Sequence, residues 1–208
     1  MAQDPIRIRQ SAAPEAPGPA FYFDLGSPEA YLAAERVLQV MPVATPWVPV
    51  LERDLGAPAV AVDRDAFTAR AAAAGLQPVR WPDPFPFDSE QAMLAATYAR
   101  AIGRVVPFSL AAFRQAFAGG RALSSDDAIV IAGSGCEMHP KALLTGSGTR
   151  GTRAALERET ALAADRGVTS VPAVWLPGAA GGGDDDDLVF HGADGLERAA
   201  AACEVLAS

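Results

Sequence analysis

The sequence is organised around one stretch, Phe21-Tyr-Phe-Asp-Leu-Gly-Ser-Pro-Glu-Ala-Tyr-Leu32. Its first five residues are mostly aromatic or aliphatic, which is typical of a short buried strand. Gly26 breaks this pattern, and Ser27 and Pro28 are residue types preferred at the N-cap and first position of a helix, expected here from Glu29 to Val40. A strand that turns sharply into a helix brings free backbone N–H groups to one point, beside the Ser27 side chain. We infer that Ser27 either caps this helix or donates to an incoming anion such as a thiolate.

This stretch resembles the opening of the 2-hydroxychromene-2-carboxylate isomerases and kappa-class glutathione transferases, the glutathione-using branch of the DsbA-like thioredoxin-fold superfamily. In the redox members of that superfamily a Cys-x-x-Cys occupies the turn, whereas residues 27–30 here are Ser-Pro-Glu-Ala. Because neither sulfur is present, dithiol–disulfide exchange at this turn is excluded. The resemblance implies an α/β thioredoxin fold, and chemistry that depends on glutathione or another low-molecular-weight thiol.

The composition is that of a globular protein and argues against several kinds of partner. The 208 residues suffice for one well-buried domain, half of them are hydrophobic, and the formal net charge is −8. Such an acidic chain is not expected to bind a nucleic-acid backbone or an anionic membrane surface. No apolar run is long enough to span a membrane, and the N-terminal residues lack the apolar centre of a secretory signal. With only two cysteines in unrelated segments, a reducing cytoplasm is the expected compartment, and a small-molecule substrate is what the resemblance implies.

The cysteines and histidines give no sign of a metal site. The chain has two of each, and none lies at a spacing typical of metal ligands, so no metal cofactor is expected. Cys136 and Cys203 fall in unrelated predicted segments, which argues against a disulfide scaffold. A redox role for either thiol would require an exposed sulfur with a lowered pKa, and Cys203 is expected to be buried on the last helix.

Strand patterns occur at both ends of the chain, with helical patterns between them. Residues 45–51 are expected to form a second strand, at a sheet edge because it contains two prolines. Residues 171–176 and 188–190 are expected to form two more, followed by a helix from Asp194. The alanine-rich residues between predict a series of helices. The sequence thus predicts a disordered tail at 1–19, a thioredoxin-like βαβ … ββα domain from 20–55 and 167–208, and a large all-helical insertion at 56–166.

A second segment is expected to face Ser27. Gly167-Val-Thr-Ser-Val-Pro172 resembles the Gly-Val-x-x-Val-Pro segment of the superfamily, in which the proline is cis and faces the active-site turn. A cis Val171–Pro172 bond would leave the N–H and C=O of Val171 free to pair with a peptide-like ligand such as glutathione. A trans Pro172 would only begin a strand.

A third segment precedes the last helix. His191-Gly-Ala-Asp194 resembles the stretch that opens the last helix of the family. The resemblance implies that Asp194, with Gly192 and Ala193, binds the γ-glutamyl end of glutathione through its ammonium group. Asp194 is equally suited to cap the helix. The arginine that follows in the family is replaced here by Gly195.

The substrate side of the site is expected in the proline-rich loop of residues 81–88, before the next helical pattern. Phe85-Pro-Phe-Asp-Ser-x-x-Ala-Met93 resembles the Phe-Pro-x-Asn-Thr-x-x-Ala-Met pattern of the isomerases, with Asp88 in the place of the Asn. Trp81, Phe85 and Phe87, with Asp88, are expected either to line a hydrophobic substrate pocket or to pack as a cover on the core. Residues 50–58 are shorter than the corresponding loop of the isomerases and lack its Asn and Lys.

Together these segments predict a thiol-dependent isomerase or glutathione transferase similar to 2-hydroxychromene-2-carboxylate isomerase. In that interpretation Ser27 stabilises the thiolate, Val171 holds the cysteinyl backbone and Asp194 holds the γ-glutamyl end. Two alternatives remain, a catalytically degenerate thioredoxin-fold binding module and a relative of the DsbA oxidoreductases that has lost dithiol chemistry. Relatives are commonly dimers, so the resemblance also allows a homodimer.

Overall fold

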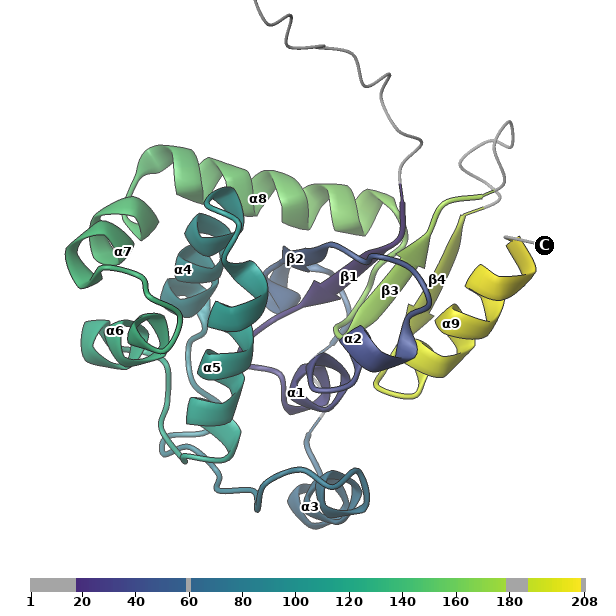
Figure 1. The fold of residues 1–208 in the computed structure, drawn as a ribbon, viewed down its shortest axis with the longest axis horizontal. Coiled ribbons are helices and arrows are strands. Elements are labelled where there is room, and N and C mark those ends of the chain that lie inside the picture. Colours follow the sequence, from purple (N-terminus) through teal and green to yellow (C-terminus); the bar gives the residue numbers. More distant parts are fainter. Residues whose placement is uncertain (1–17, 59–60, 179–186, 207–208) are drawn as a thin grey trace, which may run out of the picture.

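Four short strands form one mixed sheet in the part of the chain that the computed structural model describes, residues 18–58, 61–178 and 187–206. The strands are β1 (Ala20–Phe23), β2 (Trp47–Pro49), β3 (Ala173–Leu176) and β4 (Leu188–His191). They lie in the order β2-β1-β3-β4, with β2 parallel to β1 and the other neighbours antiparallel (Figure 1). The edge position predicted for the second strand is confirmed.

The turn after β1 leads into two short helices, α1 (Pro28–Ala34) and α2 (Val37–Val40). The prediction of a single helix from Glu29 to Val40 is therefore wrong. The N–H of Arg36 bonds the carbonyl of Ala33, three residues back rather than four, and this tighter turn ends α1.

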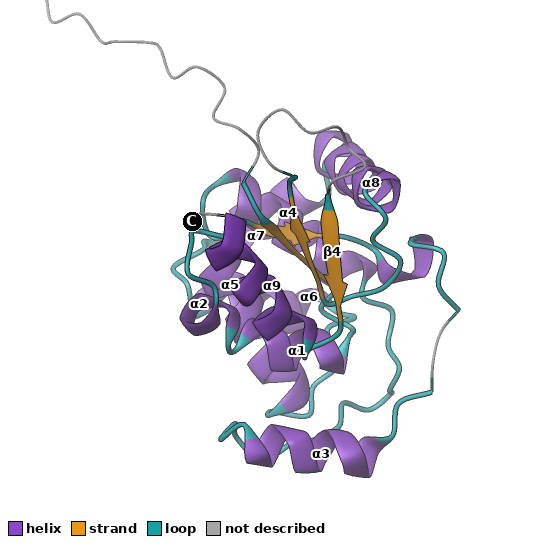
Figure 2. Cartoon of the chain, turned by 90° about the vertical axis from the view of Figure 1, so that its right-hand side faces the viewer, coloured by secondary structure: helices purple, strands orange, loops and turns teal. Residues whose placement is uncertain are grey.

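Helices cover both faces of the sheet, and the alternation of side chains along each strand decides which layer a residue meets. Phe21 and Phe23 of β1 belong to the larger core cluster, which includes residues of α1 and α9. Tyr22, between them, belongs to a smaller cluster with Ala163. Figure 2 shows the same division, with α1 and α9 on one side of the sheet and α8, which carries Ala163, on the other.

Between β2 and β3 the described chain forms helices joined by loops. It forms the 3₁₀ turn η1 (Glu52–Asp54), α3 (Arg64–Ala73), α4 (Glu90–Ala101), α5 (Val105–Phe117), α6 (Asp126–Ser134), α7 (Pro140–Ser147) and α8 (Arg150–Asp165). Asp63, Ser125 and Thr149 begin α3, α6 and α8, because their side-chain oxygens accept the free N–H groups of the first turn.

Helices α3 to α8 fall within the predicted insertion, residues 56–166, but α8 also packs on the sheet. The hydroxyl of Thr160 on α8 accepts the N–H of Leu51, just after β2, at 3.1 Å. The division of the chain into domains stays a prediction. The predicted tail, residues 1–19, lies outside the described residues except for its last two.

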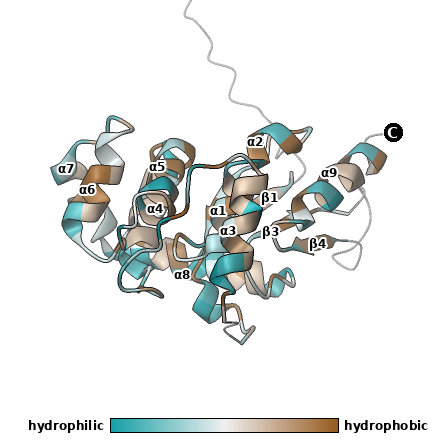
Figure 3. Cartoon of the chain, turned by 90° about the horizontal axis from the view of Figure 1, so that it is seen from below, coloured by the Kyte–Doolittle hydropathy of each residue, from teal (hydrophilic) through white to brown (hydrophobic). Residues whose placement is uncertain are grey.

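The last helix, α9 (Gly195–Leu206), is amphipathic. Leu196, Ala199 and Cys203 are buried at helical spacing, and hydrophilic and hydrophobic segments both occur along α9 in Figure 3. Within the described ranges, no helix combines the length and the apolarity needed to cross a membrane.

Candidate functional site

The turn that carries Ser27 is held by the buried carboxylate of Asp24. The side-chain Oδ1 of Asp24 accepts the N–H of Gly26 at 2.8 Å, and the backbone carbonyl oxygen of Asp24 accepts the N–H of Ser27 at 3.0 Å. A Cβ on Gly26 would lie 3.2 Å from Cβ of Ser89 and 3.3 Å from Oδ1 of Asp24, which is closer than most such contacts. Glycine therefore allows this turn to close against the start of α4.

Ser27 is the N-cap of α1, and its hydroxyl is only weakly engaged. Its Oγ accepts the N–H of Ala30 at 3.4 Å and donates to the carbonyl oxygen of Val171 at 3.5 Å. Both distances exceed the ~3 Å of a strong hydrogen bond, so the hydroxyl can turn toward a better acceptor. Ser27 is only 5% exposed, and a ligand that reaches it has to displace a neighbouring group.

The second and third predicted segments meet the first at this point. The Val171–Pro172 peptide bond is cis, and Val171 lies against the Ser27 hydroxyl. The carbonyl oxygen of Pro172 accepts the N–H of Gly192 at 2.9 Å. The structure thus brings together Ser27, Val171, Pro172 and the turn before α9.

The turn before α9 is compact. Ala193 is buried, Asp194 is exposed, and the N–H of Gly195 bonds the carbonyl of Gly192 at 2.9 Å. Within the described part of the chain no hydrogen bond or ion pair involves the Asp194 side chain. A Cβ on Gly195 would stand 3.0 Å from the carbonyl carbon and oxygen of Phe190, so a side chain at this position would press on the main chain of β4.

Sequence reasoning missed Glu52, which lies in η1. Its N–H donates to Oδ2 of Asp24 at 3.0 Å, so Asp24 holds the turns after both β1 and β2. Its own Oε1 accepts the N–H of Val171 at 3.2 Å. The N–H and C=O of Val171, expected to be free for a ligand, are therefore both hydrogen-bonded within the chain. The position of Glu52 in the sequence could have indicated it. Because β2 is parallel to β1, the residues that follow β2 lie at the same end of the sheet as the Ser27 turn.

The two acids of the site have raised pKa values. Burial raises the pKa of Asp24, although hydrogen bonds from the N–H groups of Glu52 and Gly26 and from the Ser89 side chain act in the opposite direction. Loss of hydration raises the pKa of Glu52 to about 7, opposed by the N–H of Val171 and reinforced by the charge of Asp24. Glu52 therefore changes its protonation near neutral pH.

Asp88 belongs to an ion-pair network beside the site rather than to an apolar pocket. Its Oδ1 accepts from Nη1 of Arg53 at 3.1 Å and from the N–H of Glu90 at 3.0 Å. Glu90 also pairs with Arg53, at 2.5 Å, and with Arg153. These two arginines lower the pKa of Glu90. Arg53, next to Glu52 in sequence, is thus directed to Asp88 and Glu90.

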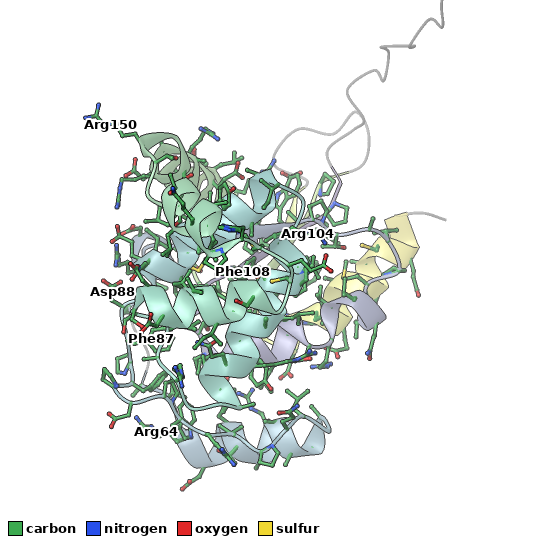
Figure 4. The ribbon with its side chains drawn as sticks, turned by 60° about the vertical axis from the view of Figure 1, so that its left-hand side comes forward. Arg64, Phe87, Asp88, Arg104, Phe108 and Arg150 are labelled. Carbon is green, nitrogen blue, oxygen red and sulfur yellow. The ribbon has the colours of Figure 1, made fainter. Side chains whose placement is uncertain are left out.

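The aromatic residues of the same loop pack on the core. Trp81 and Phe85 contact each other with ring centroids 4.9 Å apart, and both contact Phe117 of α5 at 6.2 Å. The guanidinium of Arg64 lies over both rings, at 5.0 and 5.4 Å. Phe87 is half-buried against the core and lies beside Asp88, and Arg64 is the first residue of α3 (Figure 4). These contacts agree with the expectation that the aromatic residues cover the core. The alternative, that they line a substrate pocket, stays a prediction.

Neither thiol meets the conditions for redox chemistry. Cys136 and Cys203 are both buried and free, and burial raises the pKa of each. Among the described residues no cluster of His, Cys, Asp and Glu is arranged to hold a metal ion.

No family model matches the sequence, and no curated protein matches it, whereas solved structures match the fold. A 2-hydroxychromene-2-carboxylate isomerase has a TM-score of 0.74 and 18% identity, over 91% of this chain and 95% of that one. A probable DsbA oxidoreductase from Streptomyces coelicolor has a TM-score of 0.65 and 19% identity, over 88% of each chain. The cytosolic disulfide reductase DsbM from Pseudomonas aeruginosa, in a structure with GSH, has a TM-score of 0.57 and 15% identity, over 82% and 88%. The predicted α/β thioredoxin fold of the DsbA-like proteins, with its helical insertion, is confirmed.

Proposed function

We propose that this protein is an enzyme that uses glutathione or another low-molecular-weight thiol, as an isomerase or transferase similar to 2-hydroxychromene-2-carboxylate isomerase. The observation that carries the proposal is the Ser27 hydroxyl, which makes only two long contacts, one to the carbonyl oxygen of Val171 and one from the N–H of Ala30, and is therefore free to turn. Residues 27–30 contain no sulfur, so a sulfur that reacts here has to come from the ligand.

The residues present fit a thiol at Ser27. A bound thiol supplies a nucleophilic sulfur that adds reversibly to a conjugated carbonyl compound, so that a double bond becomes single, rotates, and reforms when the sulfur leaves. Ser27 donates its hydroxyl hydrogen to the sulfur and favours the ionised form. Because α1 has only seven residues, most of this stabilisation falls to the hydroxyl rather than to the helix dipole.

The other predicted groups take the roles that the fold resemblance suggests. The turn of Gly192, Ala193 and Asp194 lies next to Pro172, where the exposed Asp194 carboxylate can accept an ammonium group. A ligand whose main chain pairs with the N–H of Val171 has to displace the Glu52 carboxylate from it. The proposal includes a cytoplasmic location, which the cytosolic DsbM neighbour supports, and a homodimer, which sedimentation analysis would test.

Calorimetric titration of glutathione into the wild type and Ser27→Ala tests the thiol site. We expect the variant to bind the thiolate roughly 10- to 100-fold more weakly, because one hydrogen bond to a charged group is lost. S-methylglutathione, which cannot form a thiolate, should bind both proteins alike. Ser125→Ala is the matched control, because Ser125 also caps a helix, accepting the N–H of Ala128 at 3.3 Å, but lies on α6. Equal affinities of wild type and Ser27→Ala would contradict the proposal.

A non-catalytic module that binds a small ligand other than a peptide is the second candidate, and one observation favours it over a glutathione-using enzyme. The N–H of Val171, which a peptide-like ligand would use, is taken by Glu52. An activity assay separates the two candidates. The enzyme isomerises or conjugates an electrophilic carbonyl compound only when a thiol is supplied. The binding module converts no such compound, whichever thiol is supplied.

A further inference from the structure

Glu52 reverses the hydrogen-bonding character of the ligand site next to Ser27. A backbone N–H at Val171 would offer a donor to the carbonyl group of a peptide-like ligand. In this chain Oε1 of Glu52 already accepts that N–H, at 3.2 Å. A ligand that approaches Ser27 therefore meets a carboxylate, which accepts hydrogen bonds, in the place of a donor.

The second oxygen of this carboxylate is available. The Glu52 side chain is half-buried, and no hydrogen bond to its Oε2 occurs within the described residues. The N–H of Glu52 is fixed by Oδ2 of Asp24 at 3.0 Å, which holds the backbone of η1 in place. The carboxylate is thus a positioned acceptor with one free oxygen.

The charges around Glu52 leave it without a cation of its own. The charged neighbour that most affects it is Asp24, a second acid. Arg53, the adjacent residue, is directed to Asp88 and Glu90. No lysine, arginine or histidine in the described ranges forms an ion pair with Glu52. A half-buried carboxylate beside another acid gains most from a ligand that brings a positive charge.

We propose that Glu52 is a specificity-determining residue that selects a thiol carrying an ammonium group, an aminothiol, over thiols with a neutral or carbonyl group at that position. This inference rests on the proposed function, since it names the class of thiol that the Ser27 site takes. Glutathione would be disfavoured, because its cysteinyl carbonyl would face the carboxylate or have to displace it from Val171.

The test compares two thiols of equal length that differ in the group at the other end. Cysteamine carries an ammonium group, and 2-mercaptoethanol carries a hydroxyl. Their dissociation constants are measured by calorimetry at about one pH unit above 7, where Glu52 is mostly ionised. We expect the wild type to bind cysteamine roughly fivefold more tightly than 2-mercaptoethanol, the range of a partly buried charged contact. Glu52→Gln, which keeps the shape and the acceptor for Val171 but removes the charge, should lower the ratio several-fold, to the value set by the more acidic thiol of cysteamine alone.

Asp54→Asn is the matched control, because Asp54 lies in the same 3₁₀ turn and is exposed, and it should keep the wild-type ratio. Glu52→Ala should bind glutathione more tightly than the wild type, since the N–H of Val171 is released. A wild-type ratio near one, or a ratio that persists in Glu52→Gln, would overturn the role of Glu52 while leaving the thiol site intact. If neither small thiol nor glutathione binds the wild type, the proposed function fails and this inference fails with it.

Discussion

Asp24 and Glu52 organise the turn that carries Ser27, although neither has an opposite charge as its direct partner. Asp24 is wholly buried, and its carboxylate is compensated by donated hydrogen bonds from Gly26 and Glu52. Glu52 is compensated by a single N–H, that of Val171. A carboxylate is costly to remove from water even when it is hydrogen-bonded. The position of the site is therefore maintained by groups that weaken the fold when they are ionised.

Glu52 makes stability depend on pH near neutrality. The folded state binds a proton with a pKa of about 7, whereas the unfolded state binds it near the ordinary value of 4.5. As the pH falls through 7 the folded state gains a proton that the unfolded state does not, so stability rises on acidification. We expect a gain of about 1 kcal/mol in the free energy of unfolding from one pH unit above 7 to one below, after allowance for partial exposure.

Denaturant unfolding of the wild type and Glu52→Gln at both pH values measures this contribution, and the variant should lack it. His191 acts in the opposite direction: burial lowers its pKa from 6.5, so its neutral form is favoured and stability falls at lower pH. Because His191 is present in both proteins, the difference between them isolates Glu52. Identical pH dependence of the two proteins would contradict the raised pKa.

At the scale of elements, the start of α9 depends on the absence of a side chain at Gly195. Gly195→Ala places a Cβ about 3 Å from the main chain of Phe190 at the end of β4. We expect it to destabilise the fold by ~1–3 kcal/mol, because backbone cannot move aside as a flexible side chain can. Gly151→Ala, in the first turn of α8 with only Oγ1 of Thr149 at 3.9 Å, should be neutral or slightly stabilising. Thermal unfolding measures the stability of both variants. Equal effects of the two substitutions would contradict the close approach of residue 195 to the main chain of Phe190.

The elements could be predicted from sequence where a local signal sets them. Ser27 caps α1, one of the two roles expected for it, because a cap depends only on residues within one turn of it. The break between α1 and α2 was not predictable, since the apolar pattern continues through Glu35 and Arg36. The contact between Glu52 and Val171 joins residues 119 apart in sequence, and a long-range pair of this kind leaves no periodic signal. The site was therefore predictable as three segments, but not with the acid that lies between them.

At the scale of the whole molecule, an aromatic cluster joins the inserted helices to the sheet layer. Phe117 of α5 stacks on Tyr31 of α1 at 5.7 Å and contacts Phe67 of α3 at 6.3 Å, in addition to Trp81 and Phe85. Phe117→Ala should cost ~3–5 kcal/mol of unfolding free energy, because it leaves a cavity between these elements. Leu38→Ala on α2, where the side chain is 63% exposed, should change it by less than ~0.5 kcal/mol.

Chemical denaturation monitored by far-UV circular dichroism and by tryptophan fluorescence would test this. The two signals should coincide in the wild type and shift together in Phe117→Ala if helices and sheet unfold as one unit. A loss below ~1 kcal/mol in Phe117→Ala would mean that the cluster relaxes around the missing ring and does not join the layers.

The proline in β2 has a consequence for how molecules of this protein meet one another. The N–H of Val50 and the carbonyl of Pro46 point toward β1, so alternation directs the backbone groups of Trp47 and Pro49 away from the sheet. Pro49 has no N–H, and the donor it removes is one that a strand from another molecule would need. Strand-by-strand growth is therefore blocked at this edge, and β4 is left as the edge where a further strand could pair. A sheet that continues from molecule to molecule, the first step toward a fibril, would need both edges to be free for pairing.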